Sequence, residues 1–137
     1  MTIHAQASAT DQMFDPIRRA ERIFEVVLPD SLQTILKQIA IANHHEVCGF
    51  IDVHYGFHVV DNIHDERTHN FLMDEDSFTS TMKRIYGSDN AVLGMWHTHP
   101  NNVVWPTPRD LAGWPNPDLK WKYWIVTNNQ VIEWRLL

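Results

Sequence analysis

Residues 91–110 read AVLGMWHTHPNNVVWPTPRD, and this stretch carries the clearest information about the fold. Its first part, residues 91–98, is rich in apolar, aromatic and β-branched residues, which predicts a buried strand. The prolines and asparagines of residues 101–108 predict a loop after that strand. The last two residues of this loop, Thr107 and Pro108, favour an N-cap and a first helical position, so a short helix is expected next.

Similar elements are expected on both sides of this stretch. Further segments rich in β-branched and aromatic residues predict strands over residues 22–28, 46–53, 56–63, 122–127 and 131–136. Other segments repeat apolar residues at helical spacing, each after an aspartate that can cap a helix. They run from Asp30 to about Asn43 and from Asp74 to Tyr86. The pattern as a whole predicts an α/β (α+β) domain with a mixed central sheet flanked by helices.

Length and composition favour a single domain. The chain has 137 residues, 44% of them apolar and 11% aromatic, which is enough for one core and too little for two substantial domains. Residues 1–20 lack a clear periodicity and begin with a polar, small-residue stretch, so we expect a flexible N-terminal arm there. The folded domain is expected to span residues 21–137.

Charge and cysteine content narrow the expected partners and location. A net charge of −6, without any run of Lys or Arg, argues against a nucleic-acid partner, because such partners are bound through phosphate neutralisation. Cys48 is the single cysteine, so it forms no internal disulfide, which suits a reducing compartment. We find no secretory signal and no stretch of about 18 apolar residues. The sequence therefore predicts a cytoplasmic protein without a membrane span.

The most informative side chains are two histidines and an aspartate. His97 and His99 lie two positions apart at the end of a predicted strand, so both imidazoles project from the same face and can reach one ion. Asp110 follows after a loop and a helix start, and it can supply the third ligand of a catalytic zinc site that keeps an open fourth position. Taken singly, each feature also occurs without a metal: His-x-His pairs lie on many surface strands, and Thr107 with Asp110 can form an ordinary capping box.

The combined spacing resembles the JAMM motif of catalytically competent JAB/MPN domains, which is written Glu…His-x-His-x7-Ser-x-x-Asp. The matching residues are Glu46, His97, His99, Thr107 and Asp110. The resemblance extends to residues 46–51, to the Gly94-Met95-Trp96 lead-in and to a loop asparagine, Asn70, and it covers residues 22–137. The chain departs from the motif at Thr107, which stands where the family usually has serine.

This resemblance implies a layered JAB/MPN-like fold of the cytidine-deaminase-like kind and a zinc metallopeptidase. It implies that Zn²⁺ is bound by His97, His99 and Asp110, with water in the fourth position. Glu46 would act as the general base, and the hydroxyl of Thr107 would stabilise the tetrahedral oxyanion. The implied reaction is the hydrolysis of a peptide or isopeptide bond in a protein or peptide substrate.

The family contains deubiquitinases, enzymes that trim sulfur-carrier proteins, and peptidase domains of phage tail assembly proteins. The strand at residues 46–51 and the closing hairpin are most similar to the phage tail group, so we expect a phage or prophage tail-associated metallopeptidase that acts among tail proteins. Its expected location is the bacterial host cytoplasm, or the virion. Two alternatives stay open: a deconjugating isopeptidase for a bacterial ubiquitin-like or sulfur-carrier protein, and a non-catalytic tail-tip component stapled by its metal.

Other chemical interpretations fit the sequence less well. His45 and Glu46 begin like His-Glu-x-x-His, but Gly49 occupies the position of the second histidine. A zinc deaminase needs at least two cysteines, and the chain has one. Cys48 lies among apolar residues that raise a thiol pKa, so we expect a structural cysteine. Among the tryptophans, we expect Trp96 and Trp124 in the core, whereas Trp105 can belong to a core or to a substrate cleft.

Overall fold

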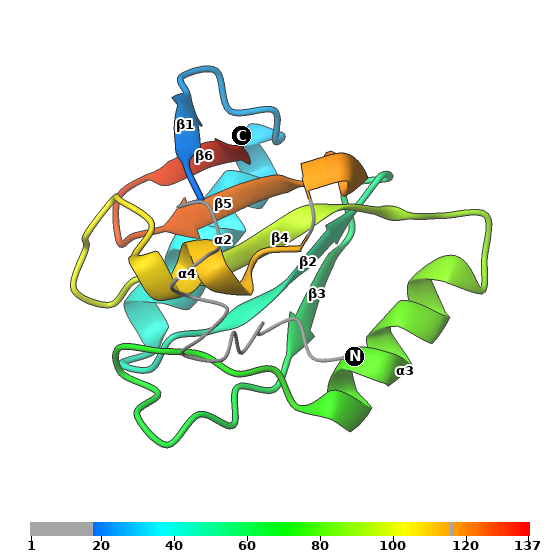
Figure 1. The fold of residues 1–137 in the computed structure, drawn as a ribbon, viewed down its shortest axis with the longest axis horizontal. Coiled ribbons are helices and arrows are strands. Elements are labelled where there is room, and N and C mark those ends of the chain that lie inside the picture. Colours follow the sequence, from blue (N-terminus) through cyan, green and yellow to red (C-terminus); the bar gives the residue numbers. More distant parts are fainter. Residues whose placement is uncertain (1–17, 116) are drawn as a thin grey trace.

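The predicted strands assemble into one sheet in the computed structural model, which describes residues 18–115 and 117–137 (Figure 1). The strands are β1 (Ala20–Ile23), β2 (Cys48–Asp52), β3 (Phe57–Val60), β4 (Val92–Thr98), β5 (Lys122–Val126) and β6 (Val131–Leu136). They form a six-stranded sheet in the order β1-β6-β5-β4-β2-β3. Only β4 and β5 run parallel, and the other neighbours are antiparallel. The expected mixed sheet is confirmed.

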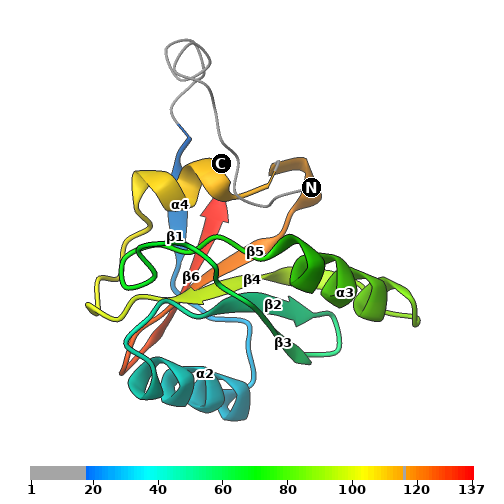
Figure 2. The ribbon, with the colours of Figure 1, turned by 90° about the horizontal axis from the view of Figure 1, so that it is seen from below.

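Helices cover both faces of the sheet. They are α2 (Asp30–Ala42), α3 (Glu75–Tyr86) and α4 (Pro108–Gly113), with a short 3₁₀ turn η1 (Pro117–Leu119). Figure 2 shows α2 beneath the sheet and α3 and α4 above it. Leu32, Leu36 and Ala40 form the buried face of α2 and pack into a core with Trp96 and Trp124. A second core lies on the opposite face of the sheet, so the domain has three layers.

Strand β4 lies at the centre of the sheet, between β5 and β2. Six of its seven residues are buried. At Gly94 the β5 backbone approaches so closely that an added Cβ would lie 2.0 Å from the carbonyl oxygen of Lys122. Glycine is therefore required here for the parallel pair to form. From this pair the register of β4 and β5 continues to His97, which lies opposite Ile125.

The strand predicted over residues 22–28 is shorter and shifted: β1 ends at Ile23. The next residues leave the sheet, and the backbone N–H of Val27 donates to the buried carboxylate of Glu133 instead of to a strand partner, at 3.0 Å. The predicted capping by Asp30 is also wrong. Pro29 occupies the N-cap position without a side-chain bond, and Asp30 is the first helical residue, where its charge favours the helix dipole.

The strand predicted over residues 46–53 begins late, at Cys48. Glu46 therefore lies in irregular backbone just before β2. Val47 links this segment to β4, because its N–H donates to Oγ1 of Thr98 and its carbonyl accepts from the Thr98 N–H. The strand predicted over residues 56–63 is likewise shorter, since β3 ends at Val60 and the chain then enters a long loop.

Several local predictions are confirmed. Asp74 caps α3 by accepting a hydrogen bond from the N–H of Ser77, and the helix ends at Tyr86. The hairpin of β5 and β6 forms around residues 127–130. Of the predicted arm, residues 1–17 lie outside the described residues, whereas Ala20 already belongs to β1. Within the described part of the chain, no helix has the length and apolar character needed to span a membrane.

Candidate metal centre

The two histidines project from the carboxyl end of β4. His97 belongs to the strand, where it pairs with Cys48 on β2 and with Ile125 on β5. His99 follows the strand directly, and its N–H still donates to the carbonyl of Val126, at 2.9 Å. Each histidine is only 3% exposed. The alternation of side chains along the strand therefore brings both rings to one buried point, with their Nε2 atoms 2.9 Å apart.

Asp110 reaches the same point from the first turn of α4. Thr107 caps this helix in a capping box: Thr107 Oγ1 accepts from the Asp110 N–H, and Asp110 Oδ2 accepts from the Thr107 N–H. The same Oδ2 atom lies 3.3 Å from His97 Nε2 and 3.2 Å from His99 Nε2. The helix cap and the predicted ligand are therefore not alternatives, because one carboxylate oxygen serves the cap and faces both histidines.

These three atoms have the spacing of ligands around one small cation. Zinc bound tetrahedrally at about 2.0–2.1 Å has ligand atoms about 3.3–3.4 Å apart. The separations of 2.9, 3.2 and 3.3 Å lie within a few tenths of that value. Two imidazoles and a carboxylate are also a donor set that zinc commonly takes in catalytic sites. The residues present thus fit a bound divalent cation.

The orientation of His99 supports the same conclusion. Its Nδ1 lies 2.7 Å from the carbonyl oxygen of Val103, so Nδ1 must carry the proton and donate. Nε2 then faces the carboxylate of Asp110 at 3.2 Å, so either a proton on Nε2 or a metal cation lies between the two atoms. A backbone carbonyl that fixes the tautomer of a histidine in this way is typical of metal sites.

Glu46 supplies the fourth group. Its side chain is 5% exposed, and its ligand atom and those of His97, His99 and Asp110 all lie within 4.8 Å of one another. Its Oε1 atom has no hydrogen-bond partner among the described residues. A buried carboxylate oxygen without a partner is costly, so this atom points to a species that binds at the centre. The structure thus brings together four of the five predicted site residues in one buried cluster.

Burial sets the charges of this cluster. Desolvation raises the pKa of Glu46 to about 8, although the nearby His99 charge lowers it. Burial also lowers the pKa of His97, which favours the neutral imidazole needed for a metal ligand. Burial alone would raise the pKa of Asp110, but the adjacent histidines hold it well below its ordinary value. Burial would lower the pKa of His99, but the contacts with Asp110 raise it above its ordinary value. The cluster therefore combines an ionised carboxylate with a neutral His97 and a His99 whose positive charge a divalent cation could replace.

Thr107, the fifth predicted residue, lies at the rim. It is exposed, and its hydroxyl oxygen accepts the capping bond from the Asp110 N–H, while none of the hydrogen bonds among the described residues uses its hydroxyl proton. Cys48 lies next to this centre on β2 but is fully buried, and burial raises its pKa further above the ordinary thiol value. The prediction of a structural cysteine agrees with this inert environment.

The tryptophans fall into a buried group and an exposed one. Trp96 and Trp124 are completely buried, as predicted. Trp105 lies in the loop between His99 and α4 and is 61% exposed. Its ring lies near that of Trp134 on β6. Trp114 stacks on Tyr123 with ring centroids 4.2 Å apart, so it belongs to the core.

Sequence reasoning missed the residues that surround the cluster. Phe71 packs its ring on that of His97, with centroids 4.8 Å apart. His64 contacts Arg109, the neighbour of Asp110, at 3.0 Å. The side-chain amide of Asn62 donates to the backbone carbonyl of Glu46. Asn70, the asparagine named from the sequence, accepts from the same amide through its backbone carbonyl. No local sequence signal distinguishes these loop residues, because their partners are distant in the chain.

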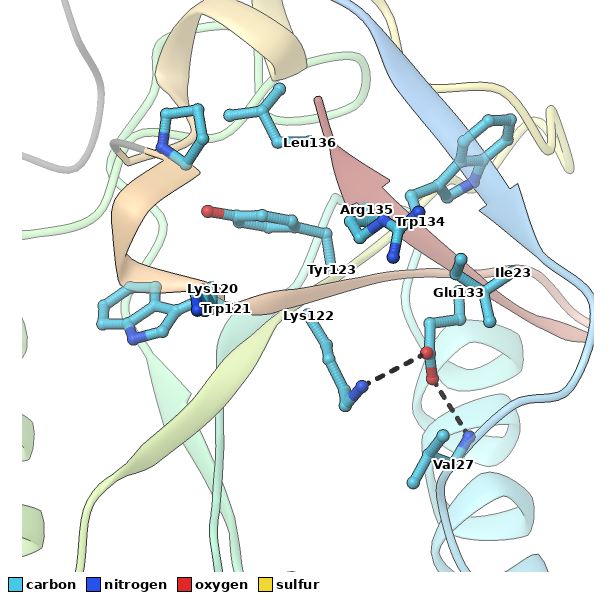
Figure 3. Close-up of a pocket in the computed structure, with 11 residues that line it drawn as sticks. Ile23, Val27, Lys120, Trp121, Lys122, Tyr123, Glu133, Trp134, Arg135 and Leu136 are labelled. Carbon is cyan, nitrogen blue, oxygen red and sulfur yellow. Dashed lines mark hydrogen bonds and ion pairs between the residues drawn. The ribbon is translucent and has the colours of Figure 1, made fainter.

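A separate pocket of about 530 Å³ lies at the start of β5, away from the histidines (Figure 3). Trp121 and Tyr123 line it, together with Lys122, whose ammonium lies 3.7 Å from the carboxylate of Glu133. Because β4 and β5 are parallel and Gly94 pairs with Lys122, this pocket lies beside the start of the two strands, whereas the histidines lie at their ends. The pocket is therefore distinct from the cluster.

Residues 29–137 match the family described as prokaryotic homologs of the JAB domain. The chain belongs to this family. Its fold is similar to that of protein DSY2949 from Desulfitobacterium hafniense, known from a solution structure, with a TM-score of 0.55 and 20% sequence identity. The similarity covers 73% of this JAB-family chain and 72% of DSY2949. No curated protein matches the chain. The predicted resemblance is confirmed, and the buried cluster fits the JAMM motif.

Proposed function

We propose that the protein is a zinc-dependent peptidase or isopeptidase. Its family and its buried cluster support a JAMM-type metal-dependent hydrolase. The observation that carries the proposal of a zinc-dependent peptidase is Oε1 of Glu46, which has no partner among the described residues and lies beside three atoms with the spacing of zinc ligands. A carboxylate that is held at a cation site and bonded to no protein group is suited to act on a water molecule there.

His97, His99 and Asp110 would hold the ion. When bound, zinc supplies Lewis acidity, which lowers the pKa of water towards about 7 and polarises the carbonyl of a substrate. The three ligands come from a central strand and from a capped helix, so they are preorganised. Their burial limits the access of bulk water, which strengthens the electrostatic interactions within the site.

Glu46 is the proposed general base. It takes a proton from water as the water oxygen forms a bond to the carbonyl carbon of the substrate, and it returns that proton to the amine when the carbon–nitrogen bond breaks. Thr107 lies at the rim, and its hydroxyl would donate a hydrogen bond to the oxyanion of the tetrahedral species. The capping bond fixes the hydroxyl oxygen, so its position does not depend on the extra methyl group of threonine.

The proposed substrate is a protein of phage tail assembly, which would make the chain a phage or prophage tail-associated metallopeptidase. The support is the similarity of residues 46–51 and of the β5–β6 hairpin to that group of the family. The exposed ring of Trp105 belongs to the loop whose Val103 carbonyl contacts His99, and it offers an apolar surface for an extended substrate.

The test compares zinc-loaded wild type with Glu46→Gln on tail proteins and on conjugates of ubiquitin-like proteins, with new chain ends detected by mass spectrometry. We expect cleavage by the wild type and a loss of about 10²–10⁴-fold in the variant, because general base catalysis contributes that much. Zinc content should be unchanged. Glu66→Gln, an exposed glutamate in the neighbouring loop, is the matched control and should retain full activity.

Each result selects one interpretation. Full activity of Glu46→Gln refutes the assignment of the general base. Cleavage of the conjugates alone selects a deconjugating isopeptidase. Zinc binding without cleavage of any of these proteins selects a non-catalytic assembly component.

A further inference from the structure

Glu46 has an unusual position for a proposed catalytic group, because no helix or strand holds it. Its N–H donates to the carbonyl of Arg67 at 2.6 Å, and its carbonyl accepts from the side-chain amide of Asn62 at 2.8 Å. Both partners belong to residues 61–73, the loop between β3 and α3, which we call the β3–α3 loop. The backbone of Glu46 is thus fixed on one side by this loop.

The side chain of Asn62 uses all of its hydrogen-bonding capacity inside this region. Its Nδ2 donates to the carbonyls of Glu46 and Asn70, at 2.8 and 3.1 Å. Its Oδ1 accepts from the N–H groups of His64 and Leu72, each at 3.0 Å. A primary amide has two donors and an acceptor oxygen with two lone pairs, so every position is filled. Asn62 therefore folds the loop with its oxygen and ties it to Glu46 with its nitrogen.

The same loop also contacts His97, one of the proposed metal ligands. Phe71 follows Asn70 directly and packs on the ring of His97. The backbone bond between Ile63 and Leu72 closes the two sides of the loop. Asn62 lies where these sides meet, so its four bonds set the position of the loop relative to both Glu46 and His97.

We propose that Asn62 is a positioning residue, whose side-chain amide fixes the backbone of Glu46 and thereby places the Glu46 carboxylate beside His97, His99 and Asp110. The inference rests on the proposed role of Glu46 as the general base. Asn62 lies outside the cluster and binds only backbone groups among the contacts described, so it acts through Glu46. A displacement of a catalytic group by about 1 Å can lower a rate about 100-fold.

The variant Asn62→Asp separates the two functions of the side chain. A carboxylate keeps the acceptors that fold the loop through His64 and Leu72, but it replaces the donor nitrogen with an oxygen that faces the Glu46 carbonyl. Asn62→Ala removes both functions and serves as the second variant if the aspartate form does not fold. Asp74→Ala is the matched control, because it weakens the cap of α3 and leaves Glu46 untouched.

The first measurement is amide hydrogen exchange of the zinc-loaded protein, followed residue by residue by NMR. The variant removes the bond from Asn62 to the Glu46 carbonyl, while the Glu46 N–H keeps its own partner, the carbonyl of Arg67. We expect the loosened segment to open more often, so that the Glu46 amide exchanges about tenfold faster in Asn62→Asp while the amides of β4 stay protected. Zinc affinity should stay within about threefold of the wild type. Asp74→Ala should leave exchange at Glu46 unchanged. Unchanged exchange at Glu46 in both Asn62 variants would overturn the proposal.

The second measurement uses any substrate that the wild type cleaves. We expect kcat to fall about 10- to 100-fold in Asn62→Asp, with KM unchanged, because the variant misplaces the base and leaves the binding surface intact. A fall in zinc affinity as steep as the fall in kcat would refute the proposal, since Asn62 would then support the ligands. If exchange rises as expected while Glu46→Gln is fully active, the positioning of Glu46 stands and its role as the base fails.

Discussion

The substitution Asp110→Asn separates two functions of Asp110, which caps α4 and is the proposed third ligand of the candidate metal centre. Asp110 Oδ2 accepts the capping bond from the Thr107 N–H at 2.9 Å and lies 3.3 and 3.2 Å from the Nε2 atoms of His97 and His99. Asparagine has the same shape and retains an acceptor oxygen, so it can still cap α4. It loses the negative charge, and a neutral amide oxygen is a poor zinc ligand. The variant should therefore fold and bind zinc weakly.

The magnitude follows from linkage between binding and folding. At free zinc equal to 100 times the wild-type Kd, binding stabilises the folded state by about 2.7 kcal/mol. For a domain of this length, that corresponds to a rise in Tm of roughly 8–11 °C. Loss of even an outer-shell partner weakens metal binding about 10- to 100-fold, so loss of a direct ligand should weaken it at least about 100-fold. Asp110→Asn at the same zinc concentration then gains at most about 0.4 kcal/mol, or roughly 1–2 °C.

Thermal unfolding with and without zinc, together with calorimetric titration, measures both quantities. Asp74→Asn is the control, because it makes the same chemical change at the start of α3, where asparagine caps as well as aspartate. Its zinc-induced rise in Tm should equal that of the wild type. An equal rise in Asp110→Asn would refute the ligand assignment, and a loss of folding without zinc would show that the charge, and not only the cap, holds α4.

Two further predictions concern groups outside the centre. Cys48 is fully buried, and burial raises the pKa of its thiol. A thiol reagent should therefore label Cys48 only as fast as the protein unfolds, and rapid labelling of the native protein would contradict this. Asp52 is buried, which alone would raise its pKa, but the bond from His58 at 2.8 Å and the N–H groups of Gly56 and His54 lower it below the ordinary 3.8. Because the folded-state pKa is the lower one, this stabilisation is present above about pH 4 and is lost as the pH falls further. Asp52→Asn should therefore cost about 1.5–3 kcal/mol in urea unfolding at pH 7, and this cost should fall as the pH is lowered below about 4. A cost that does not change with pH would rule out the charged bond as its source.

The sequence predicted those features whose signals are local. Helix α3 was expected from Asp74 to Tyr86 because its cap and its apolar spacing lie within consecutive turns. The position of His97 and His99 on one face needs only the alternation of a strand. The capping box of α4 was visible for the same reason, since its two members lie three residues apart.

Features that depend on distant partners could not be predicted. Residues 24–28 do not continue β1, and the N–H of Val27 donates to Glu133, a residue more than 100 positions away in the chain. Glu46 looked like a strand residue because its neighbours are apolar and β-branched, but its backbone bonds go to a loop and not to a strand. The contribution of Asn62 has no pattern of its own, because an asparagine in a polar loop has the same appearance whether or not its amide is fully bonded.

The pairing of β1 with β6 affects the order of folding. Ala20 lies opposite Leu136, so this pair joins the two ends of the described chain. Closing so long a loop costs chain entropy before any contact between the strands can form. The cluster instead uses residues between Glu46 and Asp110, which lie on or next to the central strands β2 and β4 and on helix α4. We therefore expect β1 to dock late, with a φ-value near zero for Ile23→Val, after the four residues of the cluster have come together.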